Sequence, residues 1–138
     1  MPPPRTPTLS PVERRRSPRY DVDVPCEVIT LQHDIAHGRI RDLSVSGLQI
    51  QGDGHFIRTL YPKSKRENWR TPLKILVKAS FPTSQPVQYE AELWCQLVYC
   101  KRSSADLYKV GCQYLEISPD VQTALLDHIS RFGVLKNY

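Results

Sequence analysis

The chain lacks any hydrophobic run long enough to cross a bilayer, which takes roughly 20 consecutive apolar residues. Its first 20 residues also lack the apolar core of a secretory signal. No glycine-rich phosphate loop, no H-E-x-x-H and no G-x-S-x-G motif occurs among its 138 residues. These absences predict a cytoplasmic protein that does not associate with a membrane, and they give no support to an enzymatic function.

Groups that could carry catalysis or hold a metal are few. The four histidines lie in expected loops or on an expected terminal helix, without a nucleophile in a recognisable arrangement beside them: His33, His37, His55 and His128. The first two form an H-x-x-x-H spacing near an expected turn, which is too little for zinc without clustered cysteine or histidine ligands. We therefore predict a protein that is not an enzyme and that has no metal site and no cofactor.

The cysteines do not form a C-x-x-C pair, and in a cytoplasmic chain they are expected to stay reduced. Each lies within an apolar strand pattern, where a free cysteine packs as a small hydrophobic residue: Cys26, Cys95, Cys100 and Cys112. The prediction is four buried, structurally inert thiols.

Alternation of apolar and polar residues is the main signal after residue 20. Val22, Val24, Cys26 and Val28 alternate with polar residues, as in a half-buried strand. Comparable patterns predict further strands at 39–43, 48–51, 73–81, 87–101 and 110–114.

The expected strand at 87–101 has two unequal faces. One face is apolar throughout: Ala91, Leu93, Cys95, Leu97 and Tyr99. The other face begins with acidic residues but becomes apolar at Trp94 and Val98. This predicts a strand of a curved barrel that is covered on both sides at its far end.

The period changes near the end of the chain. Ser118 suits the N-cap of a helix, Pro119 suits the first helical position, and Gly133 suits the end. Between them, apolar residues recur at helical spacing: Val121, Leu125, Ile129 and Phe132. We therefore predict a mainly β fold, a six-stranded antiparallel β-barrel with one C-terminal α-helix packed on it.

The domain organisation follows from composition. Residues 1–13 hold five of the twelve prolines and are predicted to be a disordered tail. Residues 14–133 form the predicted barrel domain, which begins with a flexible basic arm, and residues 134–138 form a short tail. Within the domain, residues 52–72 are polar and irregular, with a second basic run, and are interpreted as a solvated loop or a partner surface.

Positive charge is concentrated near the start of the chain. Five of the 19 Lys and Arg residues, but only one of the 14 acidic residues, lie in residues 1–19. Four are arginines within 14–19, and this cluster contains no lysine. Arginine binds phosphate with a planar fork of donors and matches the O6/N7 edge of guanine. The cluster thus favours a ligand with phosphate and purine groups, the alternative being a flexible basic arm.

A second motif lies between two short expected strands. Asp42, Ser44 and Gly47 supply an acceptor, a hydroxyl and a residue that permits a turn which a side chain would obstruct. Taken alone, this segment is a turn of ordinary composition.

Together the two segments resemble the PilZ family, bacterial receptors for cyclic di-GMP. Arg15 and Arg19 match its R-x-x-x-R motif, and Asp42, Ser44 and Gly47 match its D/N-x-S-x-x-G motif. The resemblance covers about residues 13–132, including the barrel and the terminal helix.

The resemblance implies roles for these residues. Arg15 and Arg19 would engage phosphate and guanine edges, with Arg14 as an auxiliary group. Asp42 would accept hydrogen bonds from guanine N1 and N2. Ser44 would bond to ligand or to loop backbone, and Gly47 would leave room for close approach. Trp94 is a further candidate next to a base, the alternative being a tryptophan packed beneath the terminal helix.

The resemblance also implies a receptor that passes its signal to a partner protein, as a monomer or weak dimer. The ligand would order the arginine arm against the barrel. One alternative is a PilZ-like interaction module that does not bind nucleotide. Another is a nucleic-acid-binding barrel that uses the basic arm. The remainder of the chain is near neutral and offers little further positive surface for nucleic acid, so we expect no nucleic-acid partner.

Overall fold

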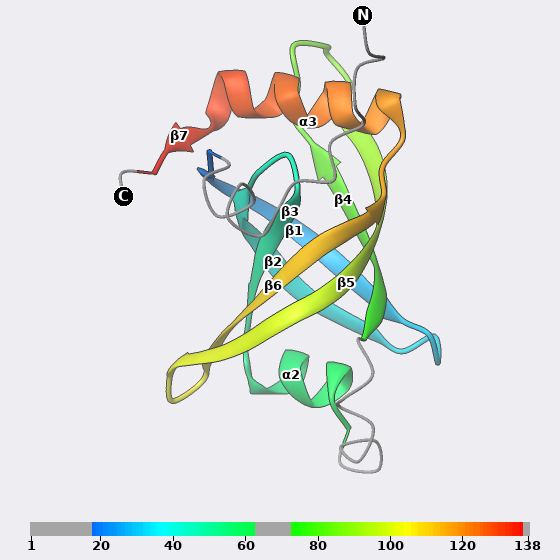
Figure 1. Ribbon diagram of the computed structural model, residues 1–138, viewed down its shortest axis with the longest axis vertical. Coiled ribbons are helices and arrows are strands. Elements are labelled where there is room, and N and C mark those ends of the chain that lie inside the picture. The colour runs from blue at the N-terminus through cyan, green and yellow to red at the C-terminus, as the bar shows by residue number, and fades with distance from the viewer. Residues whose placement is uncertain (1–17, 63–72, 137–138) are drawn as a thin grey trace, which may run out of the picture.

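The computed structural model describes residues 18–62 and 73–136 (Figure 1). Its strands are β1 (Tyr20–Thr30), β2 (Ile35–Leu43), β3 (Gly47–Gly52), β4 (Lys74–Phe81), β5 (Tyr89–Ser104), β6 (Leu107–Glu116) and β7 (Val134–Leu135). Its helices are α2 (Gly54–Leu60) and α3 (Pro119–Phe132). The strands pair in the order β2-β3-β6-β5-β4-β1-β7, and β1 also pairs with β2. This closes the predicted six-stranded antiparallel barrel, which is confirmed.

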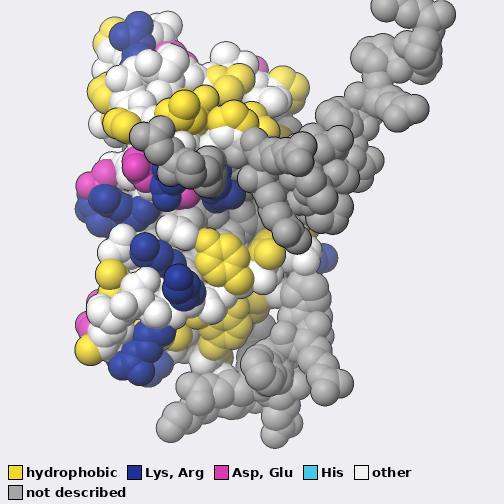
Figure 2. All heavy atoms as spheres, turned by 60° about the vertical axis from the view of Figure 1, so that its left-hand side comes forward, with side chains coloured by type: hydrophobic (Ala, Val, Ile, Leu, Met, Phe, Trp, Pro, Cys, Tyr) yellow, Lys and Arg dark blue, Asp and Glu magenta, His cyan; other side chains and the backbone are white. Residues whose placement is uncertain are grey.

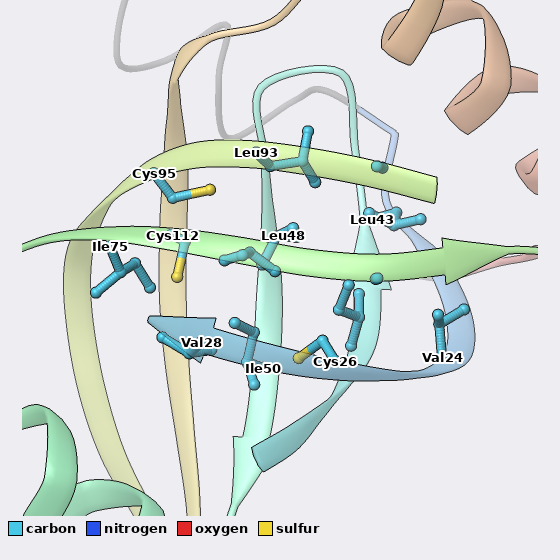
Figure 3. Packing of buried hydrophobic residues seen from close by; sticks show 14 of the residues in the cluster. Val24, Cys26, Val28, Leu43, Leu48, Ile50, Ile75, Leu93, Cys95 and Cys112 are labelled. Carbon is cyan, nitrogen blue, oxygen red and sulfur yellow. The ribbon is translucent and has the colours of Figure 1, made fainter. Parts of the chain in front are cut away.

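The alternation in β1 produces the barrel interior. Val22, Val24, Cys26 and Val28 are buried, whereas the residues between them are exposed. Side chains from all six barrel strands meet them inside, and Figure 3 shows several of these pointing toward one another. Full burial of one such side chain stabilises the fold by about 1.5–3 kcal/mol, so the regular alternation is sufficient to specify which face of each strand turns inward.

Helix α3 covers one end of the barrel (Figure 1). The Ser118 side chain accepts a hydrogen bond from the Val121 amide, and the helix ends before Gly133, as predicted. The histidine on this helix, His128, is buried, and its Nδ1 lies 2.7 Å from the Pro82 carbonyl oxygen. Phe132, which was expected on the packed face, is half exposed.

Helix α2, at the opposite end of the barrel, lies in the segment expected to be an irregular loop. Asp53 caps it by accepting a hydrogen bond from the Phe56 amide at 2.9 Å. Phe56 and Leu60 are buried against the barrel. The interpretation of 52–72 as wholly irregular is therefore wrong for its first part, whereas the basic run falls within residues 63–72, outside the described part of the chain.

The far end of β5 is not covered on both sides, contrary to expectation. Trp94 is 45% exposed and Val98 is 62% exposed. Beyond this point β5 and β6 continue past the barrel as a two-stranded ribbon (Figure 1). In the ribbon, residues 98–104 of β5 are all exposed.

Residues 134–135, placed by sequence in a tail, form β7 and pair with Asp21 and Tyr20 of β1. In the described parts of the chain, neither helix has the length and apolar composition that a membrane span requires.

Three of the four thiols lie inside the barrel, and the fourth does not. Burial raises the pKa of Cys26 and of Cys95 to about 12 and raises that of Cys112 as well. Figure 3 shows their sulfur atoms directed into the core. Cys100, predicted to pack as a core residue, is exposed on the β5–β6 ribbon.

We expect one of the four thiols of the native protein to react with Ellman's reagent at pH 8, because Cys100 alone is exposed. Partial burial raises the pKa of Cys100, so it should react more slowly than a fully solvated thiol but faster than the three buried ones. All four should react after unfolding in guanidinium. A Cys100→Ser variant should lose the rapid phase, and persistence of that phase would contradict the burial of the other three.

Candidate functional site

The site centres on Asp42, near the end of β2, whose side chain is 4% exposed. Arg19 Nε lies 2.8 Å from Asp42 Oδ1 and donates a hydrogen bond to it. Lys136 Nζ lies 2.8 Å from Asp42 Oδ2. The two segments that the sequence singled out are thus in direct contact, and both oxygens of the buried carboxylate face a cation.

Strand pairing brings these residues together. Tyr20 pairs with Leu43 and Asp21 with Asp42, so Arg19, just before β1, lies beside the end of β2. On its other side β1 pairs with β7, and the Lys136 amide donates to the Arg19 carbonyl oxygen at 3.0 Å. Residues far apart in the sequence therefore meet at one corner of the barrel. On the face shown in Figure 2, Lys and Arg side chains lie directly beside Asp and Glu side chains in the upper half of the molecule.

Lys136 has two acidic neighbours. Besides Asp42, Asp21 Oδ1 lies 3.3 Å from its Nζ. The pKa of Lys136 lies above its ordinary value, first because Asp42 accepts its hydrogen bond. The side chain therefore remains a cation at neutral pH. Sequence reasoning missed this residue, since an isolated lysine in a short terminal segment gives no signal.

Ser44 is buried and bonds within its own turn. Its amide donates to the Gly47 carbonyl oxygen at 2.9 Å, and its Oγ accepts from the Gly47 amide at 3.2 Å. Tyr114 Oη donates to the Ser44 carbonyl oxygen at 3.2 Å. Of the two partners considered for Ser44, ligand and loop backbone, the structure shows the backbone.

Gly47 lies where β3 pairs with β6. A Cβ added to it would lie 2.0 Å from the carbonyl oxygen of Cys112. No glycine in the described ranges has a positive φ. Glycine is therefore needed at position 47 because a side chain would not fit, and not because of its backbone conformation. The space that a side chain would take is filled by the neighbouring strand, which makes Gly47 necessary for the sheet that carries the site.

A shallow groove of about 200 Å³ runs from this corner across the outer face of β3, β6 and β5. Its lining residues are Arg19, Ser46, Gly47, Val98, Tyr99, Gly111, Cys112 and Gln113. Two larger hollows, of about 670 and 640 Å³, lie over β1 and its neighbours, and no residue of the two motifs lines them. We assign more weight to the groove because the buried carboxylate and its arginine stand at its end.

Tyr99 is the residue of the groove that sequence reasoning placed on the wrong face. The β5–β6 register shifts between Leu97 and Tyr99, which turns Tyr99 outward. Its ring lies against Gly111, where an added Cβ would be 2.0 Å from a ring carbon, and its Oη accepts from Gln49 Nε2 at 2.7 Å. A glycine inside a strand, such as Gly111, was the available signal for this close approach.

The remaining candidates do not join this cluster. Arg14 and Arg15 fall outside the described residues. Trp94 lies on the outer face of β5 opposite Leu76 and Glu116, and it does not line the groove. Its exposure also places it away from the packed underside of α3.

Comparison with solved structures finds the same barrel in several proteins. The inhibitor of motility MotI (DgrA) of Bacillus subtilis aligns with a TM-score of 0.64 and 17% identity over 93% of this chain and 55% of its own. The PilZ domain of YcgR from Escherichia coli, solved with c-di-GMP, aligns with a TM-score of 0.59 and 15% identity over 86% of this chain and 91% of its own. The c-di-GMP complex of K. pneumonia MrkH aligns with a TM-score of 0.54 and 19% identity, over 85% of this chain and 53% of its own.

This chain therefore spans little more than half the length of MotI and MrkH. No curated protein sequence matches it. At such identities the structural likenesses establish the fold. The sequence itself matches the family described as "PilZ domain" over residues 13–131, which includes both motifs and all six barrel strands. The chain therefore belongs to the PilZ domain family.

Proposed function

We propose that the chain is a non-enzymatic receptor for cyclic di-GMP, which it binds at the Arg19–Asp42 corner and the adjoining groove. The observation that carries the proposal is the 2.8 Å contact between Arg19 Nε and the buried Asp42 carboxylate. It joins the R-x-x-x-R and D-x-S-x-x-G segments into one site. The YcgR domain and MrkH, whose structures contain c-di-GMP, support the choice of ligand.

The chemistry of the corner suits a guanine nucleotide. A carboxylate accepts from the paired N1–H and N2–H donors of guanine, which adenine does not present. Arginine donates to phosphate oxygens and to the guanine O6/N7 edge. In this proposal Arg14 and Arg15, which precede Arg19, supply further phosphate contacts, and Tyr99 offers an aromatic edge along the groove.

The proposed output is a contact with a partner protein. A dianionic ligand neutralises the arginines of residues 14–19 and fixes them against the barrel, which changes the surface near α3 and β1. We propose that the receptor acts in the cytoplasm.

Calorimetric titration of cyclic di-GMP tests the proposal. Wild type should bind saturably, and Arg19→Ala should bind about 10- to 150-fold more weakly, the effect of losing a charged hydrogen bond of about 1.5–3 kcal/mol. Arg131→Ala removes the same charge from an exposed position on α3 and should bind like wild type. GTP serves as the ligand control, and thermal melting checks that each variant is folded.

Equal affinity of Arg19→Ala and wild type, or equal binding of GTP, would exclude the proposed site. Absence of any binding by wild type would favour the second candidate function, a protein-interaction module. One observation favours that alternative: both Asp42 oxygens already have partners within the chain.

A further inference from the structure

The partners of Asp42 conflict with its proposed role. Two adjacent donors on guanine need one acceptor position on each oxygen of a carboxylate. Oδ1 accepts from Arg19 and keeps a second lone pair, whereas Oδ2 faces Lys136 Nζ at 2.8 Å. With Lys136 in place the Asp42 side chain is 4% exposed, so a guanine edge has no open path to its oxygens. In the described state, a guanine can reach Oδ2 only if the ammonium group leaves it.

Lys136 is held at this position by a small element. β7 has two residues, both exposed, and among the described residues their strand pairing is limited to Tyr20 and Asp21. One further backbone bond, from the Lys136 amide to the Arg19 carbonyl oxygen, extends the pairing. The segment contributes no side chain to the barrel core, so it can separate from β1 without opening the core.

Asp21 gives the displaced ammonium another acceptor. Its Oδ1 lies 3.3 Å from Lys136 Nζ, and its side chain is 57% exposed. If Lys136 moves away from Asp42, its charge can remain near Asp21 in contact with solvent. The exchange of one donor for another at Asp42 then leaves no buried charge without a partner.

We propose that Lys136 is an internal competitor that occupies the guanine-binding oxygen of Asp42, and that cyclic di-GMP binds by displacing Lys136 and β7 from this corner. This inference rests on the proposed function. In this proposal the receptor is closed to ligand when β7 is paired with β1. Lys136, which lies outside both motifs, then helps to set the affinity. The competition also accounts for the pairing of both Asp42 oxygens in the described state.

Calorimetry with Lys136→Met tests the competition. Methionine resembles the aliphatic part of lysine but removes the charge and the donors. The apparent affinity for cyclic di-GMP should rise roughly tenfold, because a larger fraction of the protein is then competent to bind. Lys78→Met removes an exposed lysine that is paired with Glu92 on β5, and it should bind like wild type. Unchanged or weaker binding by Lys136→Met would overturn the proposal, because it would make Lys136 a bystander or a ligand contact.

Amide hydrogen exchange in wild type gives a second readout that does not depend on a variant. Saturation with cyclic di-GMP should reduce the protection of the Lys136 amide, because its bond to Arg19 opens when β7 separates. Retained protection in the complex would overturn the proposal while leaving the receptor function intact. Absence of binding by both wild type and Lys136→Met would instead reject the proposed function and this inference together.

Discussion

Replacing both cations around Asp42 with methionine should destabilise the fold by about 3–5 kcal/mol, the usual cost of leaving a buried charge without its partners. Arg19→Met and Lys136→Met keep apolar side chains at both positions but remove the two cations that contact the carboxylate in the described part of the chain. The Asp42 carboxylate, which is 4% exposed in the wild type, would then lose both of these countercharges. Urea denaturation of the double variant, followed by circular dichroism, measures the change in the free energy of unfolding.

Two further variants separate charge from packing. Arg19→Ala with Lys136→Ala should cost less, because shorter side chains let water reach the carboxylate. Adding Asp42→Leu to the methionine pair should restore most of the lost stability, since no buried charge remains. If it restores none, the loss comes from altered packing and the carboxylate is not its cause.

Gly47→Ala should destabilise the fold by about 3 kcal/mol, the upper end of the range for overpacking. The new Cβ would meet the Cys112 carbonyl oxygen at 2.0 Å, and this oxygen belongs to the backbone of β6. Relief therefore requires the β3–β6 ladder to separate. Chemical denaturation gives the stability, and the ligand titration described above should show weakened binding as well, because the same ladder carries the groove.

Gly111→Ala is the matched control on the neighbouring strand. Its Cβ would also lie 2.0 Å from another atom, but that atom belongs to the ring of Tyr99, a side chain that is 44% exposed and can move outward by giving up its exposed hydrogen bond to Gln49. We expect a cost of about 1 kcal/mol. A Gly111 variant as unstable as the Gly47 variant would show that the kind of atom contacted does not decide the cost.

The barrel strands were predictable because burial acts on each strand locally. The alternation of Val24, Cys26 and Val28 indicates which face is buried whatever the neighbouring strands are. Helix α3 was predictable for a similar reason, since its cap, its first proline and its apolar spacing all lie within one segment. The resemblance named Arg19 and Asp42 as ligand contacts, but their direct ion pair was not predicted, because the periodicity does not say which strand ends meet.

The features that escaped prediction depend on tertiary contacts. Helix α2 has only seven residues, and Phe56 and Leu60 stabilise it by packing against the open end of the barrel. The bulge that turns Tyr99 outward depends on the register with β6. β7 exists because β1 offers it a free edge at Tyr20 and Asp21. Lys136, the residue on which the competition depends, belongs to this last group.

The pairing order has a consequence for synthesis on the ribosome. β3 hydrogen-bonds to β2 and to β6, whereas β4 and β5, which lie between β3 and β6 in the sequence, pair with other strands. Translation proceeds at about 5–20 residues per second, so one edge of β3 waits for seconds before Leu107–Glu116 emerges. The nascent β1–β3 meander is then an open sheet with an unpaired edge. A chaperone that shields extended segments would find its substrate there, before the barrel closes.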